Sequence, residues 1–210
     1  MSKKKIAIQG ELGAYSHIAA ENLYKGSEIK TCATFEETFK EAYKDPSCKI
    51  VIPIENSLAG RVADIHYLLP KYKLQIHGEH FQTVEHNLLG KPEASLNDIK
   101  YVRSHAQAIG QCQNLIIKKN FKPIISADTA GSAKDLAEGK DKTIAAIASE
   151  LSAKIYNLKI LEKNIEDEKG NVTRFLIMGK NIEQPEFKKE KKFITSCIFR
   201  VKSEPSALYK

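Results

Sequence analysis

The sequence has no apolar run long enough to cross a lipid bilayer, and it lacks the spacing patterns of a metal or disulfide site. Its four cysteines are scattered without a C-x-x-C pair, which argues against a zinc site or a disulfide framework. The N-terminus is basic, but the apolar stretch Ile6–Ile8 gives way at once to Gln9–Glu11, so no signal-peptide core develops. We therefore expect a cytoplasmic protein that binds no membrane and no metal.

Arginine is also scarce. The net charge is +7, yet only four of the 33 basic residues are arginines. Proteins that read nucleic acids favour arginine for bidentate contacts. The densest basic cluster, residues 188–192, lies in a predicted linker and has no interleaved aromatic residues. We attribute the charge to a solvated surface and expect no nucleic-acid partner.

The first part of the chain alternates strands and helices. Residues 4–9 and 49–54 have the apolar pattern of buried strands. Residues 16–24 have helical spacing, and Thr34–Glu37 fits a capping box that opens a helix through about residue 43. This order is typical of an α/β sheet protein.

A second series of elements follows a β-rich stretch, residues 74–89, which we expect to cross between two lobes. The expected strands are 100–103, 123–126, 143–146, 158–165 and 172–178, and the expected helices are 107–119, 130–138 and 150–156. The fold class is therefore α/β, with one lobe at about residues 1–78 plus 168–180 and the other at about 79–167. Strand ends and helix N-termini should face a shared cleft, the usual place for a small anion.

The last thirty residues differ in composition. Residues 181–192 are polar and rich in Lys and Glu, which is typical of a linker. Residues 193–202 then have the pattern of one more strand. Because a lone strand cannot bury a core, we expect residues 193–210 to be the start of another, incomplete domain.

Two segments place polar groups at the carboxyl ends of strands. Gly10–Ser16 is a glycine-containing turn that exposes backbone N–H groups, although it lacks the third glycine of a dinucleotide fingerprint. Pro53–Val62 brings a carboxylate, an amide, a hydroxyl and a guanidinium together. Each segment fits either a ligand contact or a structural turn or helix cap, and both interpretations stay open.

Three more segments have the same ambiguity. Ser104–Cys112 and Asp128–Ala133 each join a strand to a helix, so their polar side chains are helix caps or ligand donors. Asn171–Leu176 begins the last strand. Strand alternation puts Thr173 and Phe175 on one side and the intervening arginine on the other, unless the strand bends.

Taken together and in this order, the segments resemble the prephenate dehydratase family over about residues 5–180. Two departures from the family pattern are Ala14, where threonine is common, and Ala106, where proline is usual. The matching landmarks are Gly10…Gly13-Ala14-Tyr15-Ser16, Pro53-Ile54-Glu55-Asn56-Ser57…Gly60…Val62, Ser104-His105…Gln107-Ala108…Gln111-Cys112, Thr129-Ala130…Ala133 and Asn171…Thr173-Arg174-Phe175.

The resemblance implies two α/β lobes similar to the type II periplasmic-binding-protein fold. It implies conversion of prephenate into phenylpyruvate, carbon dioxide and water in phenylalanine biosynthesis, without a cofactor. Family members commonly form dimers or tetramers and carry a C-terminal ACT domain that senses phenylalanine. Only the apparent start of that domain is present here, so the resemblance does not extend feedback inhibition to this sequence.

The resemblance also implies roles for individual residues. The catalytic residue is expected at Thr173, which would hydrogen-bond the leaving oxygen or relay a proton, with Glu55 or His105 restoring it. The expected substrate-binding residues are Tyr15, Ser16, Asn56, Ser57, Ser104, His105, Gln107, Thr129, Arg174 and Phe175. Two alternatives remain: an arogenate dehydratase that forms phenylalanine directly, and a non-catalytic two-lobed protein that binds small anions.

Overall fold

The computed structural model describes residues 4–181, 186, 188–190, 192, 201–202, 204 and 206–207. The predicted linker at 181–192 lies partly outside these residues, and the predicted start of a further domain at 193–210 lies mostly outside them. Those two expectations therefore stay predictions.

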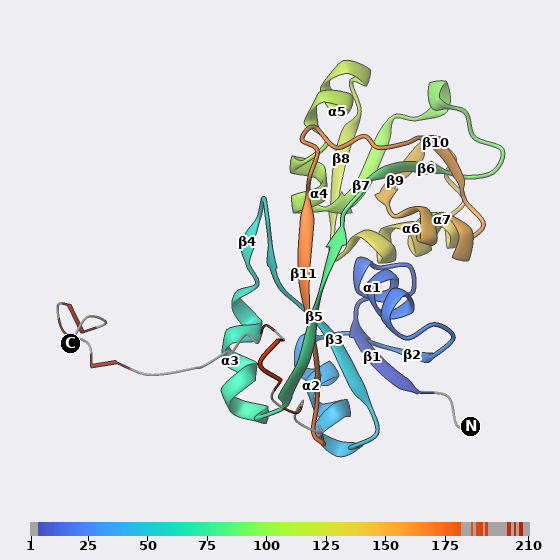
Figure 1. The fold of residues 1–210 in the computed structure, drawn as a ribbon. Coiled ribbons are helices and arrows are strands. Elements are labelled where there is room, and N and C mark those ends of the chain that lie inside the picture. Colours follow the sequence, from blue (N-terminus) through green and yellow to red (C-terminus); the bar gives the residue numbers. More distant parts are fainter. Residues whose placement is uncertain are drawn as a thin grey trace.

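The first lobe is built on a six-stranded sheet with the order β2-β1-β3-β11-β5 and with β4 paired to β3 (Figure 1). Its strands are β1 (Lys5–Gln9), β2 (Glu28–Cys32), β3 (Lys49–Asn56), β4 (Gly60–Arg61), β5 (Gln75–Thr83) and β11 (Val172–Gly179). Strands β1, β2 and β3 run parallel, whereas β11 is antiparallel to both β3 and β5. The carboxyl ends of β1 and β3 therefore point to the same edge.

Helices cover both faces of this sheet because its central strands are apolar on both sides. Ile6, Ile8 and Val51 pack against α1 (Tyr15–Leu23). Ala7, Ile50 and Ile52, which alternate with them, pack against α2 (Phe35–Lys44) and α3 (Ala63–Tyr72). The expected capping by Thr34 is confirmed, since its side chain accepts from the backbone N–H of Glu37.

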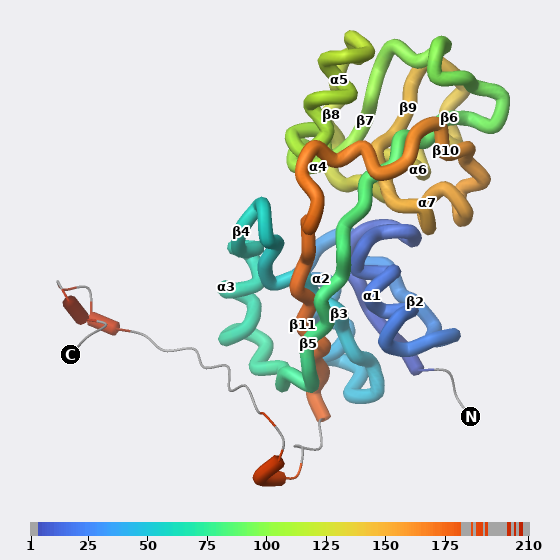
Figure 2. The backbone as a smooth tube through the Cα atoms, turned by 45° about the horizontal axis from the view of Figure 1, so that its top comes forward, coloured from blue at the N-terminus to red at the C-terminus, as the bar shows by residue number. Residues whose placement is uncertain are grey.

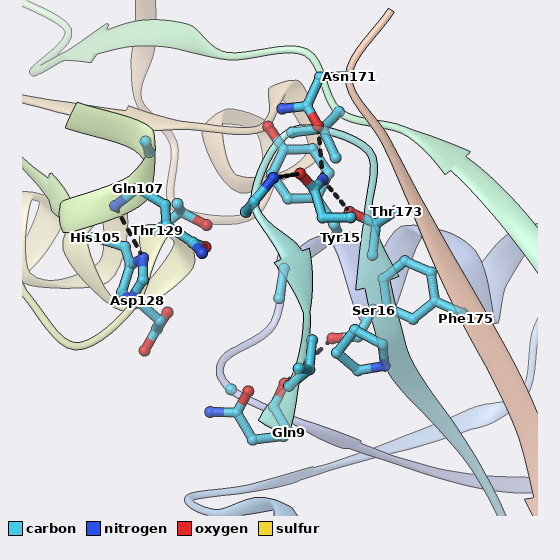
Figure 3. A pocket seen from close by; sticks show the side chains of 18 of the residues that line it. Gln9, Tyr15, Ser16, His105, Gln107, Asp128, Thr129, Asn171, Thr173 and Phe175 are labelled. Carbon is cyan, nitrogen blue, oxygen red and sulfur yellow. Dashed lines mark hydrogen bonds between the residues drawn. The ribbon is translucent and has the colours of Figure 1, made fainter. Parts of the chain in front are cut away.

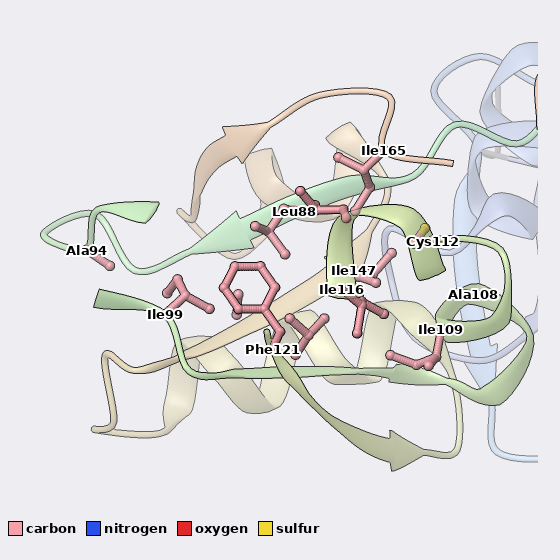
Figure 4. Close-up of a cluster of buried hydrophobic side chains, with 13 residues drawn as sticks. Leu88, Ala94, Ile99, Ala108, Ile109, Cys112, Ile116, Phe121, Ile147 and Ile165 are labelled. Atoms are coloured by element: carbon pink, nitrogen blue, oxygen red, sulfur yellow. The ribbon is translucent and has the colours of Figure 1, made fainter. Parts of the chain in front are cut away.

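The second lobe repeats this plan around a five-stranded sheet with the order β10-β6-β9-β7-β8. Its elements are β6 (Asn87–Gly90), η1 (Leu96–Asp98), β7 (Tyr101–His105), α4 (Ala106–Gly110), α5 (Gln113–Lys119), β8 (Lys122–Ser126), α6 (Thr129–Glu138), β9 (Ile144–Ala148), α7 (Glu150–Ile155) and β10 (Lys159–Glu162). On one face, Leu88, Phe121 and Ile147 pack with α4 and α5 (Figure 4). On the other face, Leu89 and Ala146 pack with α6 and α7.

Two segments connect the lobes, as the tube in Figure 2 shows. Strand β5 stays in the first sheet as far as Thr83, so the chain crosses a few residues later than expected. It returns between β10 and β11. The two crossings hydrogen-bond to each other, Val84 N to Asn171 O at 2.8 Å and Ile165 N to His86 O at 2.9 Å. The expected pair of α/β lobes is confirmed.

The helix expected at residues 107–119 is two helices. The Asp167 carboxylate, on the returning crossing, accepts from Gln113 N at 2.8 Å and Asn114 N at 3.0 Å. These N–H groups therefore start a new helix, α5, instead of continuing α4. The side chain of Gln111 lies at this break.

Gly13 is one of the contacts that the β1–α1 turn makes with the second lobe. Its carbonyl accepts from Ser149 Oγ at 2.6 Å and Ser152 Oγ at 3.1 Å. Its φ is +92°, and a Cβ there would lie 2.8 Å from the Cα of Ser152. Only glycine both adopts this φ without strain and lacks a Cβ that would clash with Ser152. Gly13 therefore allows the turn to pack against the second lobe.

Candidate active site

A cavity of about 420 Å³ lies between the lobes, where the carboxyl ends of β1, β3, β7 and β8 converge. This volume suits a small ligand. Figure 3 shows Thr173, Asn171 and Tyr15 on one side and His105, Gln107, Asp128 and Thr129 on the other. The lining residues are Gln9, Gly10, Ala14, Tyr15, Ser16, Phe35, Pro53, Asn56, Ala59, Gly60, Arg61, Val62, Val84, His86, His105, Gln107, Ala108, Gln111, Ala127, Asp128, Thr129, Asn171, Thr173 and Phe175.

Three helices begin at the cavity wall. The first residues of α1 and α6, Tyr15 and Thr129, belong to the lining, and so do His105 and Gln107, which flank the first residue of α4. Free N–H groups and the helix dipole favour an anion at such ends. At α6 part of this capacity is used, because Asp128 Oδ1 accepts from Gly131 N at 2.6 Å. The starts of α1 and α4 have no such carboxylate cap.

The hydroxyl of Thr173 has a direction that its neighbours dictate. Asn56 Oδ1 accepts from the backbone N–H groups of Leu58 and Ala59 at 3.0 and 2.9 Å. Because those groups only donate, the Asn56 amide cannot be reversed. Its Nδ2 then donates to Thr173 Oγ1 at 3.0 Å and to Asn171 Oδ1 at 2.6 Å. Thr173 therefore accepts from Asn56 and keeps its own proton for a ligand.

The orientation of the Asn56 amide also fixes the orientation of a second amide, that of Asn171. Since Asn171 Oδ1 accepts, Asn171 Nδ2 is the donor to Gln111 Oε1 at 3.0 Å. Asn171 is almost fully buried, with 1% of its surface exposed. It links Asn56 to Gln111, so the orientation of the Asn56 amide also sets the direction of the hydrogen bond to Gln111.

His105 caps α4 from the opposite wall. Its Nδ1 accepts from Gln107 N at 3.3 Å, so a neutral His105 carries its proton on Nε2. His105 is half-buried and lines the cavity, where this Nε2–H is a donor for a ligand oxygen.

Tyr15 and Ser16 line the cavity, but their protons are engaged elsewhere. Tyr15 Oη lies 2.6 Å from the Glu85 carbonyl, and Ser16 Oγ donates to the Gln9 carbonyl at 3.2 Å. Burial, together with the nearby Cys112, Glu166 and Glu85, raises the pKa of Tyr15 well above its usual value. Tyr15 is therefore a neutral hydroxyl throughout the physiological range.

Arg174 does not line the cavity. Alternation along β11 turns it to the opposite face, where Nε donates to Glu79 at 2.7 Å and Nη1 donates to Glu55 at 3.2 Å. The register irregularity that faces this point lies in β3, so β11 does not bend to bring Arg174 round. The expectation that Arg174 holds substrate and that Glu55 relays protons therefore conflicts with the geometry.

Two expected serine ligands are also directed elsewhere. Ser104 has 0% exposure and donates to the Ile147 carbonyl at 2.7 Å, because its strand, β7, lies between β9 and β8 in the interior of the sheet. Ser57 accepts from Val172 N at 3.0 Å and donates to Gly170 O at 3.3 Å. Both are structural hydrogen-bonding groups outside the cavity lining.

Several lining residues were not among the expected site residues, notably Gln9, His86, Gln111 and Asn171. Gln111 and Asn171 stand inside the landmark segments, so their motif positions were a usable signal. His86 follows a strand of mixed pattern, and nothing in its sequence neighbourhood marks it.

The described residues show no membrane or metal feature. None of their helices has the length and apolar content needed to span a bilayer. Among the same residues no group of three or more His, Cys, Asp or Glu side chains is placed to hold a metal ion. Cys32, Cys48 and Cys112 are buried, free thiols.

Fold and site together define a class: a two-lobed α/β protein whose interlobe cavity suits a small anion and presents a threonine hydroxyl as donor. The family model described as prephenate dehydratase matches residues 6–183. The chain belongs to the prephenate dehydratase family.

Individual relatives are consistent with this assignment. A bifunctional N-acyl-homoserine lactone acylase/prephenate dehydratase from Komagataeibacter europaeus is 40% identical over 208 residues, 98% of this chain and 73% of that protein. The chloroplastic arogenate dehydratase/prephenate dehydratase 2 of Arabidopsis thaliana is 38% identical, over 100% of this chain and 54% of that protein. The chain therefore spans about half the length of this plant relative.

A solved structure supports the same family. The prephenate dehydratase of Staphylococcus aureus subsp. aureus Mu50 superposes with a TM-score of 0.73 and 28% identity, over 85% of this chain and 67% of that one.

Proposed function

We propose that this chain is a prephenate dehydratase, which converts prephenate into phenylpyruvate, carbon dioxide and water. The observation that carries the proposal is the Thr173 hydroxyl, which lines the cavity and is held as an acceptor by Asn56, leaving its proton for a ligand. The family membership names the reaction, and the geometry supplies a donor suited to it.

The reaction needs such a donor because hydroxide is a poor leaving group. The bond from the ring to its carboxylate breaks, and its electron pair enters the ring as the carbon–oxygen bond to the hydroxyl breaks. The hydroxyl takes up one proton and leaves as water, and the ring becomes aromatic. Thr173 donates a hydrogen bond to the departing oxygen, and a positioned donor contributes on the order of 100- to 10,000-fold.

The cavity also fits the charge of the substrate. Prephenate carries two carboxylates, and the starts of α1 and α4, with His105 Nε2–H, offer donors to them. Gln107 and Thr129 add polar groups on the same side. Phe175, with 2% exposure, forms an apolar wall that favours loss of charge from the ring carboxylate.

Glu55, Ser57, Ser104 and Arg174 have a different role in this proposal. Their hydrogen bonds hold β3, β11 and the second sheet in register. They support the cavity without touching the substrate.

An assay with both candidate substrates tests the proposal. We expect phenylpyruvate to form from prephenate, followed by its absorbance in alkali, in the presence of wild-type protein. Preferential formation of phenylalanine from arogenate would instead favour the arogenate dehydratase alternative. Binding of prephenate without product would favour the non-catalytic alternative.

Three further expectations from the sequence remain part of this proposal. They are a cytoplasmic location, a homo-oligomeric state of two or four chains, and an ACT-type identity for residues 193–210. Light scattering of the purified chain tests the second, and phenylalanine titration of the activity tests the third.

A further inference from the structure

His86 is a buried histidine that the proposed chemistry does not use. Its exposure is 3%, and it lies on the first crossing between the lobes, at the wall of the cavity. It contacts Tyr15 of α1, Gln111 at the end of α4 and Glu166 of the returning crossing. It therefore touches both lobes and the second crossing.

The protonated nitrogen of His86 follows from its neighbours. Gln111 Oε1 already accepts from Asn171 Nδ2, whose direction is set by the fixed Asn56 amide. His86 Nε2 lies 2.9 Å from the same oxygen, and two acceptors do not bond. His86 Nε2 must therefore carry a hydrogen and donate it to Gln111.

The other ring nitrogen does not decide the tautomer. His86 Nδ1 lies 3.1 Å from Tyr15 Oη, whose single proton is donated to the Glu85 carbonyl at 2.6 Å, so the assignment rests on the contact with Gln111. Burial lowers the pKa of His86, although Gln111 and Glu166 partly oppose this, so the neutral ring with a bare Nδ1 is the form near neutral pH.

Gln111 is left with one unused group. Its oxygen accepts twice, and none of the described residues accepts from its Nε2. Gln111 is half-buried and lines the cavity. Two donors on one side of the amide leave the NH₂ group available to a ligand.

We propose that His86 is a positioning residue: its Nε2–H holds the Gln111 amide so that the NH₂ group donates to an oxygen of the bound substrate. This inference rests on the proposed function for the identity of the substrate. The hydrogen bond itself does not depend on that function, which allows the two to be tested apart.

Steady-state kinetics provides the first test. We expect His86→Leu to lower kcat/KM about 10- to 100-fold, because a displaced polar group costs roughly this much. In a Gln111→Leu background the same change should cost no more than about threefold, since His86 acts through Gln111. His86→Gln, which restores an N–H donor, should recover most of the loss.

The matched control is His77→Leu. His77 is a partly buried histidine on β5 outside the cavity lining, and its Nε2 has no hydrogen-bond partner among the described atoms. We expect wild-type kinetics. Full additivity of the His86 and Gln111 effects, or unchanged kinetics in a folded His86→Leu variant, would overturn the proposal.

Nitrogen NMR of the wild-type imidazoles provides the second test, which needs no turnover and no folded variant. At about pH 8 the His86 signals should report Nε2–H and a bare Nδ1. The reverse tautomer would overturn the proposal. A wild-type protein that shows the expected tautomer but no dehydratase activity would refute the proposed function and leave this hydrogen bond standing.

Discussion

Thr173 and Arg174 are neighbours on β11 whose side chains lie on opposite faces of the strand. They differ in whether other protein groups already occupy their hydrogen-bonding capacity. Thr173 faces the cavity, and the only hydrogen bond of its side chain within the described protein is one that it accepts. Arg174 faces away, and two carboxylates occupy its guanidinium. The charged residue is thus the saturated one, and the neutral hydroxyl retains capacity for a ligand. Spare hydrogen-bonding capacity, more than charge, distinguishes the face that does chemistry.

The largest expected effect is on the cavity face. Thr173→Val keeps the shape but removes the donor, and we expect kcat to fall on the order of 100- to 10,000-fold. Thr173→Ser, which keeps a hydroxyl, is the matched control and should retain most of the activity. Stopped-time assays of phenylpyruvate measure both. Activity of Thr173→Val within a few-fold of wild type would contradict the assignment of the catalytic donor to the cavity face of β11.

The second prediction reverses the hydroxyl without removing it. In Asn56→Asp the introduced carboxylate still accepts from Leu58 N and Ala59 N, but it no longer donates to Thr173. The Thr173 proton should then turn toward this carboxylate and away from the cavity. We expect kcat to fall about 10- to 100-fold, as for other misdirected catalytic groups. An unchanged kcat would show that the direction of this hydrogen bond is irrelevant.

The third prediction concerns the outer face. Arg174→Met removes a partly exposed ion-pair partner of Glu55 and Glu79, so the free energy of unfolding should fall by about 1 kcal/mol. Since Arg174 does not line the cavity, kcat and KM should stay within about threefold. Urea unfolding and the prephenate assay measure the two quantities. A large rise in KM at unchanged stability would instead indicate that Arg174 binds the substrate.

The smallest expected effect is a pH dependence of stability, to which His86 at the cavity wall contributes together with two histidines outside the lining. Burial lowers the pKa of His86, and it also lowers the pKa values of His17 and His77. The unfolded chain then takes up protons first, so stability is complete above about pH 6.5 and declines as the pH falls through the folded pKa values. Urea unfolding at several pH values should show this decline, and His86→Gln should reduce its slope.

Much of the architecture was predictable from local pattern. The apolar runs of β1 and β3, the capping by Thr34 and the alternation in β11 are all present as expected. Each depends on neighbours within a few residues, which is why sequence alone indicates it. The helix expected at 107–119 was wrong for the complementary reason, because the break at Gln111 is made by Asp167, which is distant in the sequence.

The candidate site divides in the same way. The landmark segments correctly brought Asn56, His105, Thr129 and Thr173 to one cavity. They did not distinguish these residues from Ser104, which has similar chemistry but is buried on an interior strand of the second sheet. Whether a polar side chain at a strand end faces a cavity or a buried carbonyl depends on which strand lies beside it.

The sequence by itself determined the family, the two α/β lobes and the position of Thr173 on the same face as Phe175, because these follow from local periodicity and ordered motifs. Only the tertiary structure decided that Arg174 is neutralised by Glu55 and Glu79, and that the Thr173 proton is free. The physical reason is that hydrogen-bond direction is inherited from fixed backbone donors through residues 115 to 117 positions apart in the chain. These hydrogen bonds, and therefore their directions, exist only once the strands are paired.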